Sequence, residues 1–288
     1  NYITSHTCCS NHALPKISRK GNLMKKFGNF NIVALVIGFS FLYIPIILLI
    51  LFSFNESRLV TVWGGFSTKW YGELMQNQGL KDAAWVTIKV AFVSSTVATI
   101  LGTIAGLVMT RFGNFRGRTL FSGMIYAPMV MPEVIIGLST LLMFVALAVD
   151  RGVFTVTLAH ITFSMCYVAV VIQSRMSSYD DSITEAALDL GCTPFRTFIL
   201  ITLPIILPAV VAGWLLSFTL SLDDLVIASF TSGPGSTTLP MKIYSMVRLG
   251  VTPEINAVST ILVGLVTLGV ISASIIGRRQ KQNVIKVS

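Results

Sequence analysis

Charged side chains are scarce in this sequence. Only 11% of its 288 residues are Asp, Glu, Lys or Arg, whereas about 25% of the residues of a soluble domain are charged. Hydrophobic residues make up 53%, and the mean hydropathy is +0.78. This composition excludes an ordinary soluble domain and predicts an all-α membrane protein that crosses the bilayer several times.

The side chains from which catalytic and metal sites are built are also few. The chain has three histidines, and it contains no H-E-x-x-H, G-x-S-x-G or G-x4-G-K-[ST] pattern. The run GPGSTT that begins at Gly233 lacks the lysine of a phosphate-binding loop. We therefore expect no enzymatic activity and no metal or cofactor in this chain, so that energy for any work must come from another subunit.

Cysteine gives no sign of a disulfide framework or a zinc site. No cysteine lies in a loop that we predict to be outside the cell, and no C-x2-C spacing occurs. The four cysteines are Cys8, Cys9, Cys166 and Cys192.

A formal net charge of +9 raises the question of nucleic-acid binding. The basic residues fall at the ends of apolar runs and do not alternate with aromatic residues on one face. This placement is typical of residues that flank membrane spans, so we expect a lipid environment and no nucleic-acid partner.

Long apolar runs predict six membrane-spanning helices. Gly102 and Gly106 form a small-x3-small pair, which favours close packing of the second span against another helix. The predicted spans are Ile32–Phe54, Ala83–Met109, Thr119–Val149, Val153–Gln173, Phe198–Leu222 and Asn256–Ile276.

The distribution of basic residues sets the predicted orientation. With the N-terminus inside, the cytoplasmic side carries fourteen of the 21 lysines and arginines. Both termini are then cytoplasmic: residues 1–31 and 278–288 form basic tails on either side of a six-span domain, residues 32–277. Within the first tail, residues 1–23 are expected to be disordered or to lie outside the functional unit.

Segment 178–204, which faces the cytoplasm in this orientation, has the pattern of two short helices joined by a glycine turn. Ser182 and Glu185 have the spacing of a capping box. Gly191 stands where a left-handed residue would close the first helix. Thr193 can cap a second helix that begins at Pro194.

The same segment resembles a known family. It matches the pattern E-A-A-x3-G-x9-I-x-L-P of the permease subunits of bacterial ABC importers. The resemblance implies the type I ABC importer permease architecture and a coupling helix that docks on a separate ATPase subunit, where ATP is bound. The residues that match the pattern are Glu185, Ala186, Ala187, Gly191, Ile201, Leu203 and Pro204.

Two further stretches resemble the permeases of that family that import putrescine or spermidine. They are SFNESRLVTVWGGFSTKWYGEL, which begins at Ser53, and FTLSLDDLVIASFTSGPGSTTLP, residues 218–240. The resemblance covers about Phe41–Ile276. It implies a place in the bacterial inner membrane and three kinds of partner, namely a second permease subunit in a heterodimer, ATP-binding cassette subunits and a periplasmic polyamine-binding protein.

Ionisable side chains inside a membrane are costly and normally face a partner or a pathway. Lys89 and Glu133 each lie about 9 Å from the outer surface if their spans are straight helices, and His160 lies near that level. We predict that Glu133 lines the translocation pathway or pairs with Lys89. Two alternatives stay open: Lys89 extends outward to the interface, or Glu133 satisfies backbone groups freed by nearby prolines.

Asp223 and Asp224 stand at the predicted outer end of the fifth span. Two adjacent carboxylates there can attract a polycation, or they can cap the turn that follows the span. The main alternative function is an ion- or proton-coupled carrier that acts without an ATPase. An ABC permease for another small solute is the second alternative, because the 178–204 segment does not distinguish solutes.

Overall fold

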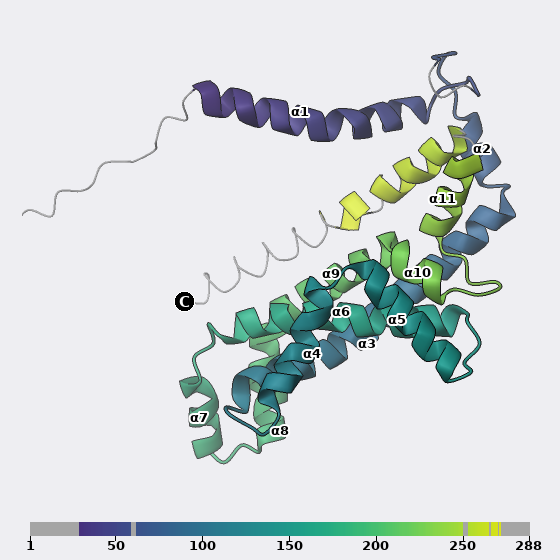
Figure 1. The fold of residues 1–288 in the computed structure, drawn as a ribbon. Coiled ribbons are helices and arrows are strands. Elements are labelled where there is room, and N and C mark those ends of the chain that lie inside the picture. Colours follow the sequence, from purple (N-terminus) through teal and green to yellow (C-terminus); the bar gives the residue numbers. More distant parts are fainter. Residues whose placement is uncertain (1–28, 59–61, 250–252, 265, 270, 272–288) are drawn as a thin grey trace, which may run out of the picture. The chain divides into compact units, whose positions relative to one another are not determined.

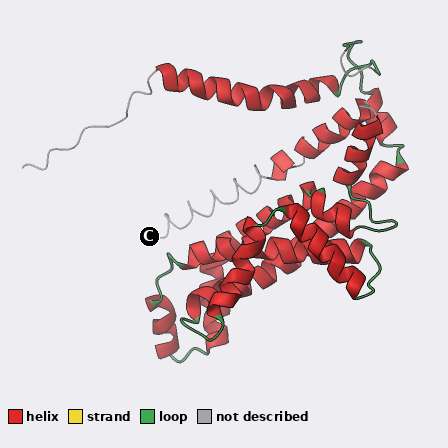
Figure 2. Ribbon diagram, in the orientation of Figure 1, coloured by secondary structure: helices red, strands yellow, loops and turns green. Residues whose placement is uncertain are grey.

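The computed structural model describes residues 29–58, 62–249, 253–264, 266–269 and 271. In these ranges the regular structure is almost entirely helical (Figures 1 and 2), apart from an isolated bridge between Asn55 and Phe66. The predicted tail 278–288, and residues 1–28 of the predicted tail 1–31, lie outside the described residues. The chain divides into two compact units, Asn1–Ile47 and Leu48–Ser288.

Helix α1 (Asn29–Phe52) coincides with most of the first predicted span, Ile32–Phe54. Its apolar stretch, Asn31–Phe52, contains 22 residues, and an 18-residue window of it has a mean hydropathy of 2.8. Since about 20 apolar residues suffice to cross the hydrocarbon core, this helix is long enough to span a membrane.

The loop after α1 is folded around a buried tryptophan. The indole Nε1 of Trp70 donates to the carbonyl of Asn55 at 2.6 Å, and Trp70 is only 3% exposed. Trp70 belongs to the short helix α2 (Lys69–Leu74). Its hydrogen bond ties α2 to the beginning of the loop.

Three long helices form the centre of the second unit: α3 (Gln78–Arg111), α6 (Val153–Met176) and α9 (Leu203–Asp223). The predicted close approach at the two glycines of α3 is confirmed. A Cβ atom on Gly102 would lie 2.7 Å from the carbonyl oxygen of Met165. A Cβ atom on Gly106 would lie 2.9 Å from that of Ala169. Only glycine at both positions lets α3 and α6 pack this closely.

The third predicted span, Thr119–Val149, is wrong as one straight helix. It consists of α4 (Arg118–Val130) and α5 (Glu133–Ala146), and the chain direction bends by 117° between them. Pro132 lies at the break, where it cannot donate a helical hydrogen bond. The bend also removes the basis for the predicted depth of Glu133, because that depth assumed a straight helix.

Two short helices follow α9, namely α10 (Val226–Thr231) and α11 (Leu239–Leu249). The sixth predicted span corresponds to a shorter apolar helix, Pro253–Gly269, and residues 272–276 lie outside the described residues. Among the described residues, four helices are long and apolar enough to cross a membrane, and the bent α4–α5 pair can make a fifth.

Candidate functional site

Segment 178–204 forms the helix–turn–helix that its sequence predicts. Helix α7 (Ser182–Asp189) is followed by a turn and by α8 (Pro194–Thr197), which begins at Pro194 as predicted. Thr193 stands at the N-cap position of α8, but its side chain makes no capping hydrogen bond. A π-helical turn, Phe198–Thr202, then leads into α9. Together α8, this turn and α9 make a continuous helix of 30 residues, Pro194–Asp223.

The predicted capping box at the start of α7 is wrong. Ser182 is the first residue of the helix, and the residue before it is Asp181. The amide of Ser182 donates to the carboxylate of Asp180 at 3.0 Å. Hydrogen bonds from the Ser182 side chain and amide hold the pKa of Asp180 below its ordinary value. Asp180, which precedes the N-cap, therefore accepts from the first amide of the helix, whereas the N-cap residue Asp181 makes no side-chain capping hydrogen bond.

The turn after α7 confirms the role predicted for Gly191. Gly191 has a φ of +85°, and its amide donates to the carbonyl of Leu188 at 2.9 Å. The amide of Cys192 donates to the carbonyl of Ala187 at 3.1 Å. This pair of hydrogen bonds is a Schellman motif, which requires a left-handed residue at the position of Gly191.

The surface of α7 and its turn is only partly as predicted. Ala186 and Ala187 are small residues on one side of the first helix, and the sequence therefore predicts that another protein can approach closely there. Glu185 and Ala186 are exposed, but Ala187 is only 6% exposed and packs into its own chain. Large apolar side chains provide the accessible surface instead: Leu190 is 87% exposed and Phe195 is 72% exposed.

The three remaining residues of the pattern lie where the hairpin joins α9. Ile201 belongs to the π-helical turn, whereas Leu203 and Pro204 begin α9. Ile201 and Leu203 are half-buried, and Leu203 packs on the core cluster around Ile206. These residues therefore attach the hairpin to the bundle.

Arg111 holds the hairpin from the opposite helix, a contact that the sequence did not reveal. This last residue of α3 pairs with the carboxylate of Asp181 at 2.8 Å and donates to the hydroxyl of Thr184 at 3.2 Å. Its guanidinium also lies 4.8 Å from the centre of the Tyr179 ring. One side chain of α3 thus contacts both the residues that directly precede α7 and the first turn of α7.

At the other end of α9, three carboxylates lie within electrostatic range of one another. Glu133 begins α5, and its charge lies within interaction range of Asp223 and Asp224 at the end of α9. Packing of α5 on α10 brings them together: a Cβ atom on Gly137 would lie 2.6 Å from the Phe230 ring. We call Glu133, Asp223 and Asp224 the acidic cluster. Glu133 and Asp223 are exposed.

Asp224 confirms the capping alternative for its own side chain. Its carboxylate accepts from the amides of Ile227 at 3.3 Å and Ala228 at 2.7 Å, in the first turn of α10. It also lies 3.1 Å from Nε2 of His160, and its side chain is only 7% exposed. Asp224 is therefore fixed, whereas the other two carboxylates of the cluster are accessible.

Lys89 lies apart from the acidic cluster. Its ammonium lies 5.0 Å from the centre of the Trp85 ring, one turn earlier on α3. Among the ion pairs of the described residues, Lys89 and Glu133 are not partners. Of the four pathway residues predicted from the sequence, the structure brings together Glu133, Asp223 and Asp224.

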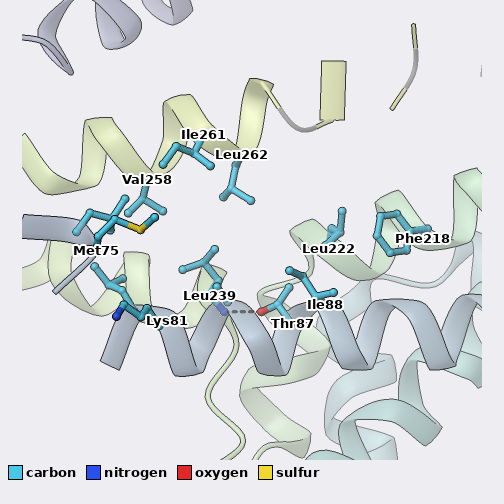
Figure 3. Close-up of a pocket in the computed structure, with 13 residues that line it drawn as sticks. Met75, Lys81, Thr87, Ile88, Phe218, Leu222, Leu239, Val258, Ile261 and Leu262 are labelled. Atoms are coloured by element: carbon cyan, nitrogen blue, oxygen red, sulfur yellow. Dashed lines mark hydrogen bonds between the residues drawn. The ribbon is translucent and has the colours of Figure 1, made fainter. Parts of the chain in front are cut away.

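A separate apolar pocket of about 200 Å³ lies between α3, α9, α11 and the helix Pro253–Gly269 (Figure 3). Its walls include Ile88, Phe218 and Leu262. The amide of Leu239 donates to the hydroxyl of Thr87 at 2.7 Å beside it. No residue of the acidic cluster lines this pocket, so it offers a cation no carboxylate.

The described part of the chain contains no group of three His, Cys, Asp or Glu side chains placed to hold a metal ion. The acidic cluster is thus spread too widely for metal coordination, which needs oxygen ligands at about 2.0–2.6 Å. Separated carboxylates suit organic ammonium groups, each of which makes its own charge-assisted hydrogen bonds.

Comparison with known proteins defines the class. Residues 98–286 match the family model described as binding-protein-dependent transport system inner membrane component. The chain belongs to this family, whose members are transport components of the membrane and not enzymes.

Particular relatives cover most of the chain. It is 55% identical over 262 residues to the putrescine transport system permease protein PotI of Escherichia coli (strain K12), a match that covers 88% of this chain and 93% of PotI. It is 44% identical over 240 residues to the spermidine/putrescine transport system permease protein PotC of the same strain, covering 83% of this chain and 90% of PotC.

Solved structures have the same fold at low sequence identity. A chain of a bacterial ABC transporter involved in the import of the acidic polysaccharide alginate matches with a TM-score of 0.67 at 17% identity, covering 88% of this chain and 95% of that chain. A chain of the MetNI methionine ABC transporter in an inward-facing conformation matches with a TM-score of 0.60 at 19% identity, covering 69% and 95%. The fold is therefore that of ABC importer permeases.

Proposed function

We propose that this chain is the permease subunit of an ATP-driven importer for a polyamine, putrescine or spermidine. The observation that carries the proposal is the acidic cluster at the end of α9, in a chain 55% identical to a putrescine permease. Polyamines carry several ammonium groups, and carboxylates in a pathway of low dielectric constant attract such cations strongly. Glu133 and Asp223 contact the solute directly.

Energy enters at the opposite end of the same continuous helix. Figure 1 places α7 and α8 at one end of α9 and α10 at its other end. The 30 residues of Pro194–Asp223 span about 45 Å at 1.5 Å per residue. Exposed Leu190 and Phe195 form the apolar part of the surface that docks on an ATPase subunit. Movement of this hairpin is transmitted to the acidic cluster through α9.

The proposed assembly includes three partners: a second permease subunit in a heterodimer, ATP-binding cassette subunits and a periplasmic polyamine-binding protein. ATP is bound by the ATPase subunits. The chain lies in the bacterial inner membrane with six spans and with both termini in the cytoplasm. The inward side is the one that carries fourteen of the 21 lysines and arginines.

Uptake of labelled putrescine and spermidine tests the role of the acidic cluster. Glu133→Gln and Asp223→Asn keep the size of each side chain and remove its charge. Because a hydrogen bond to a charged group contributes about 1.5–3 kcal/mol, each variant should lower the maximal uptake rate about tenfold or more. Asp150→Asn, at an exposed carboxylate outside the cluster, is the control.

Membrane level and ATPase association of each variant are measured in parallel. Wild-type uptake by Glu133→Gln and Asp223→Asn in assembled complexes would exclude the acidic cluster from the pathway. Uptake by the wild-type chain without any associated ATPase would instead indicate a coupled carrier.

A further inference from the structure

A buried chain of hydrogen bonds runs through the bundle behind the acidic cluster. The hydroxyl of Ser94, on α3, lies 3.1 Å from that of Ser221 on α9. The Ser221 hydroxyl lies 2.6 Å from Nδ1 of His160, on α6, and Nε2 of His160 lies 3.1 Å from the carboxylate of Asp224. Each of the first three side chains is at most 3% exposed. The chain therefore connects the three central helices and ends at one member of the acidic cluster.

The donor and the acceptor of each hydrogen bond in this network follow from Asp224, its last member. The carboxylate of Asp224 already accepts from the amides of Ile227 and Ala228, so it acts as an ionised acceptor. His160 must then donate Nε2–H to it, and a neutral imidazole presents Nδ1 as an acceptor. Ser221 donates to Nδ1, and Ser94 donates to Ser221. Each of the three hydrogen bonds that join Ser94, Ser221, His160 and Asp224 then has one donor and one acceptor when His160 is neutral and carries its proton on Nε2.

The same bonds fix where the charge of Asp224 lies. The side chain receives three donors from two elements, α6 and α10, and is 7% exposed. Glu133 and Asp223 are exposed and can adjust to a ligand. Asp224 instead supplies a fixed negative charge behind them, and His160 is the one side-chain donor that holds it among the hydrogen bonds of the described residues.

We propose that His160 is a positioning residue for transport: as the neutral Nε2–H tautomer it donates to the Asp224 carboxylate and holds it in orientation, so that the acidic cluster attracts a polyvalent organic cation. The proposal rests on the proposed function for the role of the cluster. The tautomer and its link to Asp224 do not depend on that function. A buried histidine that only supports helix packing would need neither the donor on Nε2 nor the carboxylate.

Nitrogen NMR of the assembled transporter, labelled at histidine, tests the link directly. The chain has three histidines, so His6→Gln and His12→Gln leave His160 as the only one in this subunit, and the partner subunits stay unlabelled. We expect the neutral Nε2–H form at neutral pH. Ser221→Ala should shift the Nδ1 resonance, and Asp224→Asn should shift the Nε2 resonance. An Nδ1–H tautomer, or an Nε2 resonance whose position is unchanged by Asp224→Asn, would overturn the proposal.

Uptake of labelled putrescine by two variants tests the functional half. His160→Leu removes the donor at similar size and should lower uptake per ATP hydrolysed about tenfold, which matches the loss of one hydrogen bond to a charged group. His160→Gln can still donate an amide N–H to Asp224 and should restore most of that loss. Equal loss in both variants, with normal membrane level and ATPase association, contradicts positioning by the donor.

Failure of the proposal and failure of the proposed function give different results. If His160→Leu does not assemble, Ser221→Ala replaces it, with a smaller loss of uptake expected and wild-type uptake as the contradicting result. If the wild-type transporter takes up neither putrescine nor spermidine but the NMR shifts occur as expected, the proposed function is wrong and the link from His160 to Asp224 stands.

Discussion

Single side chains join elements that lie far apart in the sequence. Arg111 is separated from Asp181 and Thr184 by some seventy residues, yet it binds both and stacks on Tyr179. Asp181 is 65% exposed, so the ion pair alone contributes little. The three contacts together restrain the first turn of α7 relative to α3.

Arg111→Ala should therefore loosen α7 without unfolding the bundle. Loss of an exposed ion pair, a hydrogen bond and a ring contact amounts to about 1–2 kcal/mol, which corresponds to about tenfold faster amide exchange. Hydrogen exchange of residues 182–189 measures this effect. Arg116→Ala, at an exposed arginine beyond α3, is the control, and equal exchange in the two variants would show that Arg111 does not restrain α7.

Local sequence patterns determine where the helices of this chain begin and end. Packing against neighbouring helices determines how closely their central residues approach one another. The crossing of α3 and α6 depends on Gly102 and Gly106, each of which leaves no room for a Cβ atom. The neighbouring atoms include backbone carbonyl oxygens, which cannot move aside as a flexible side chain can. Close packing of these two helices supports the site of Ser94 and His160.

Gly102→Ala should consequently destabilise the bundle although alanine favours helix formation. Forcing one methyl group into a packed core costs about 1–3 kcal/mol. Thermal unfolding in detergent should show a lower midpoint for this variant. Gly123→Ala, at a helical glycine whose Cβ would meet no atom within 4 Å, should not lower it. An unchanged midpoint for Gly102→Ala would show that α3 and α6 accommodate the added methyl group without loss of stability.

The same distinction explains what could be predicted from the sequence. Long apolar runs indicate spans because the bilayer requires about 20 apolar residues. Gly191 and Pro194 mark the hairpin because their backbone requirements are local. The bend between α4 and α5 lies inside one apolar run, and hydropathy carries no information on the direction of a helix axis. The contacts of His160 and Arg111 depend on how helices pack, which no local pattern contains.

In the molecule as a whole, one continuous helix joins the 178–204 hairpin, where we propose that an ATPase subunit docks, to the carboxylates of the acidic cluster. The hairpin at one end of Pro194–Asp223 matches the E-A-A pattern, and the acidic cluster lies at the other end. Because α9 packs against α3 and α6, we expect a shift of the hairpin to move these helices relative to one another. This arrangement fits the proposal that ATP is bound by a separate subunit and acts on this chain through the hairpin.

Uptake of labelled putrescine and spermidine, measured with co-purification of the ATPase subunit, tests this link most directly through Gly191→Pro. Proline cannot adopt the φ of +85° at this position, and it removes the amide that donates to Leu188. Gly123→Ala is the control. We predict that Gly191→Pro loses uptake and ATPase association together while its membrane level is unchanged. Wild-type uptake by Gly191→Pro, or uptake that continues without an associated ATPase, would contradict the account.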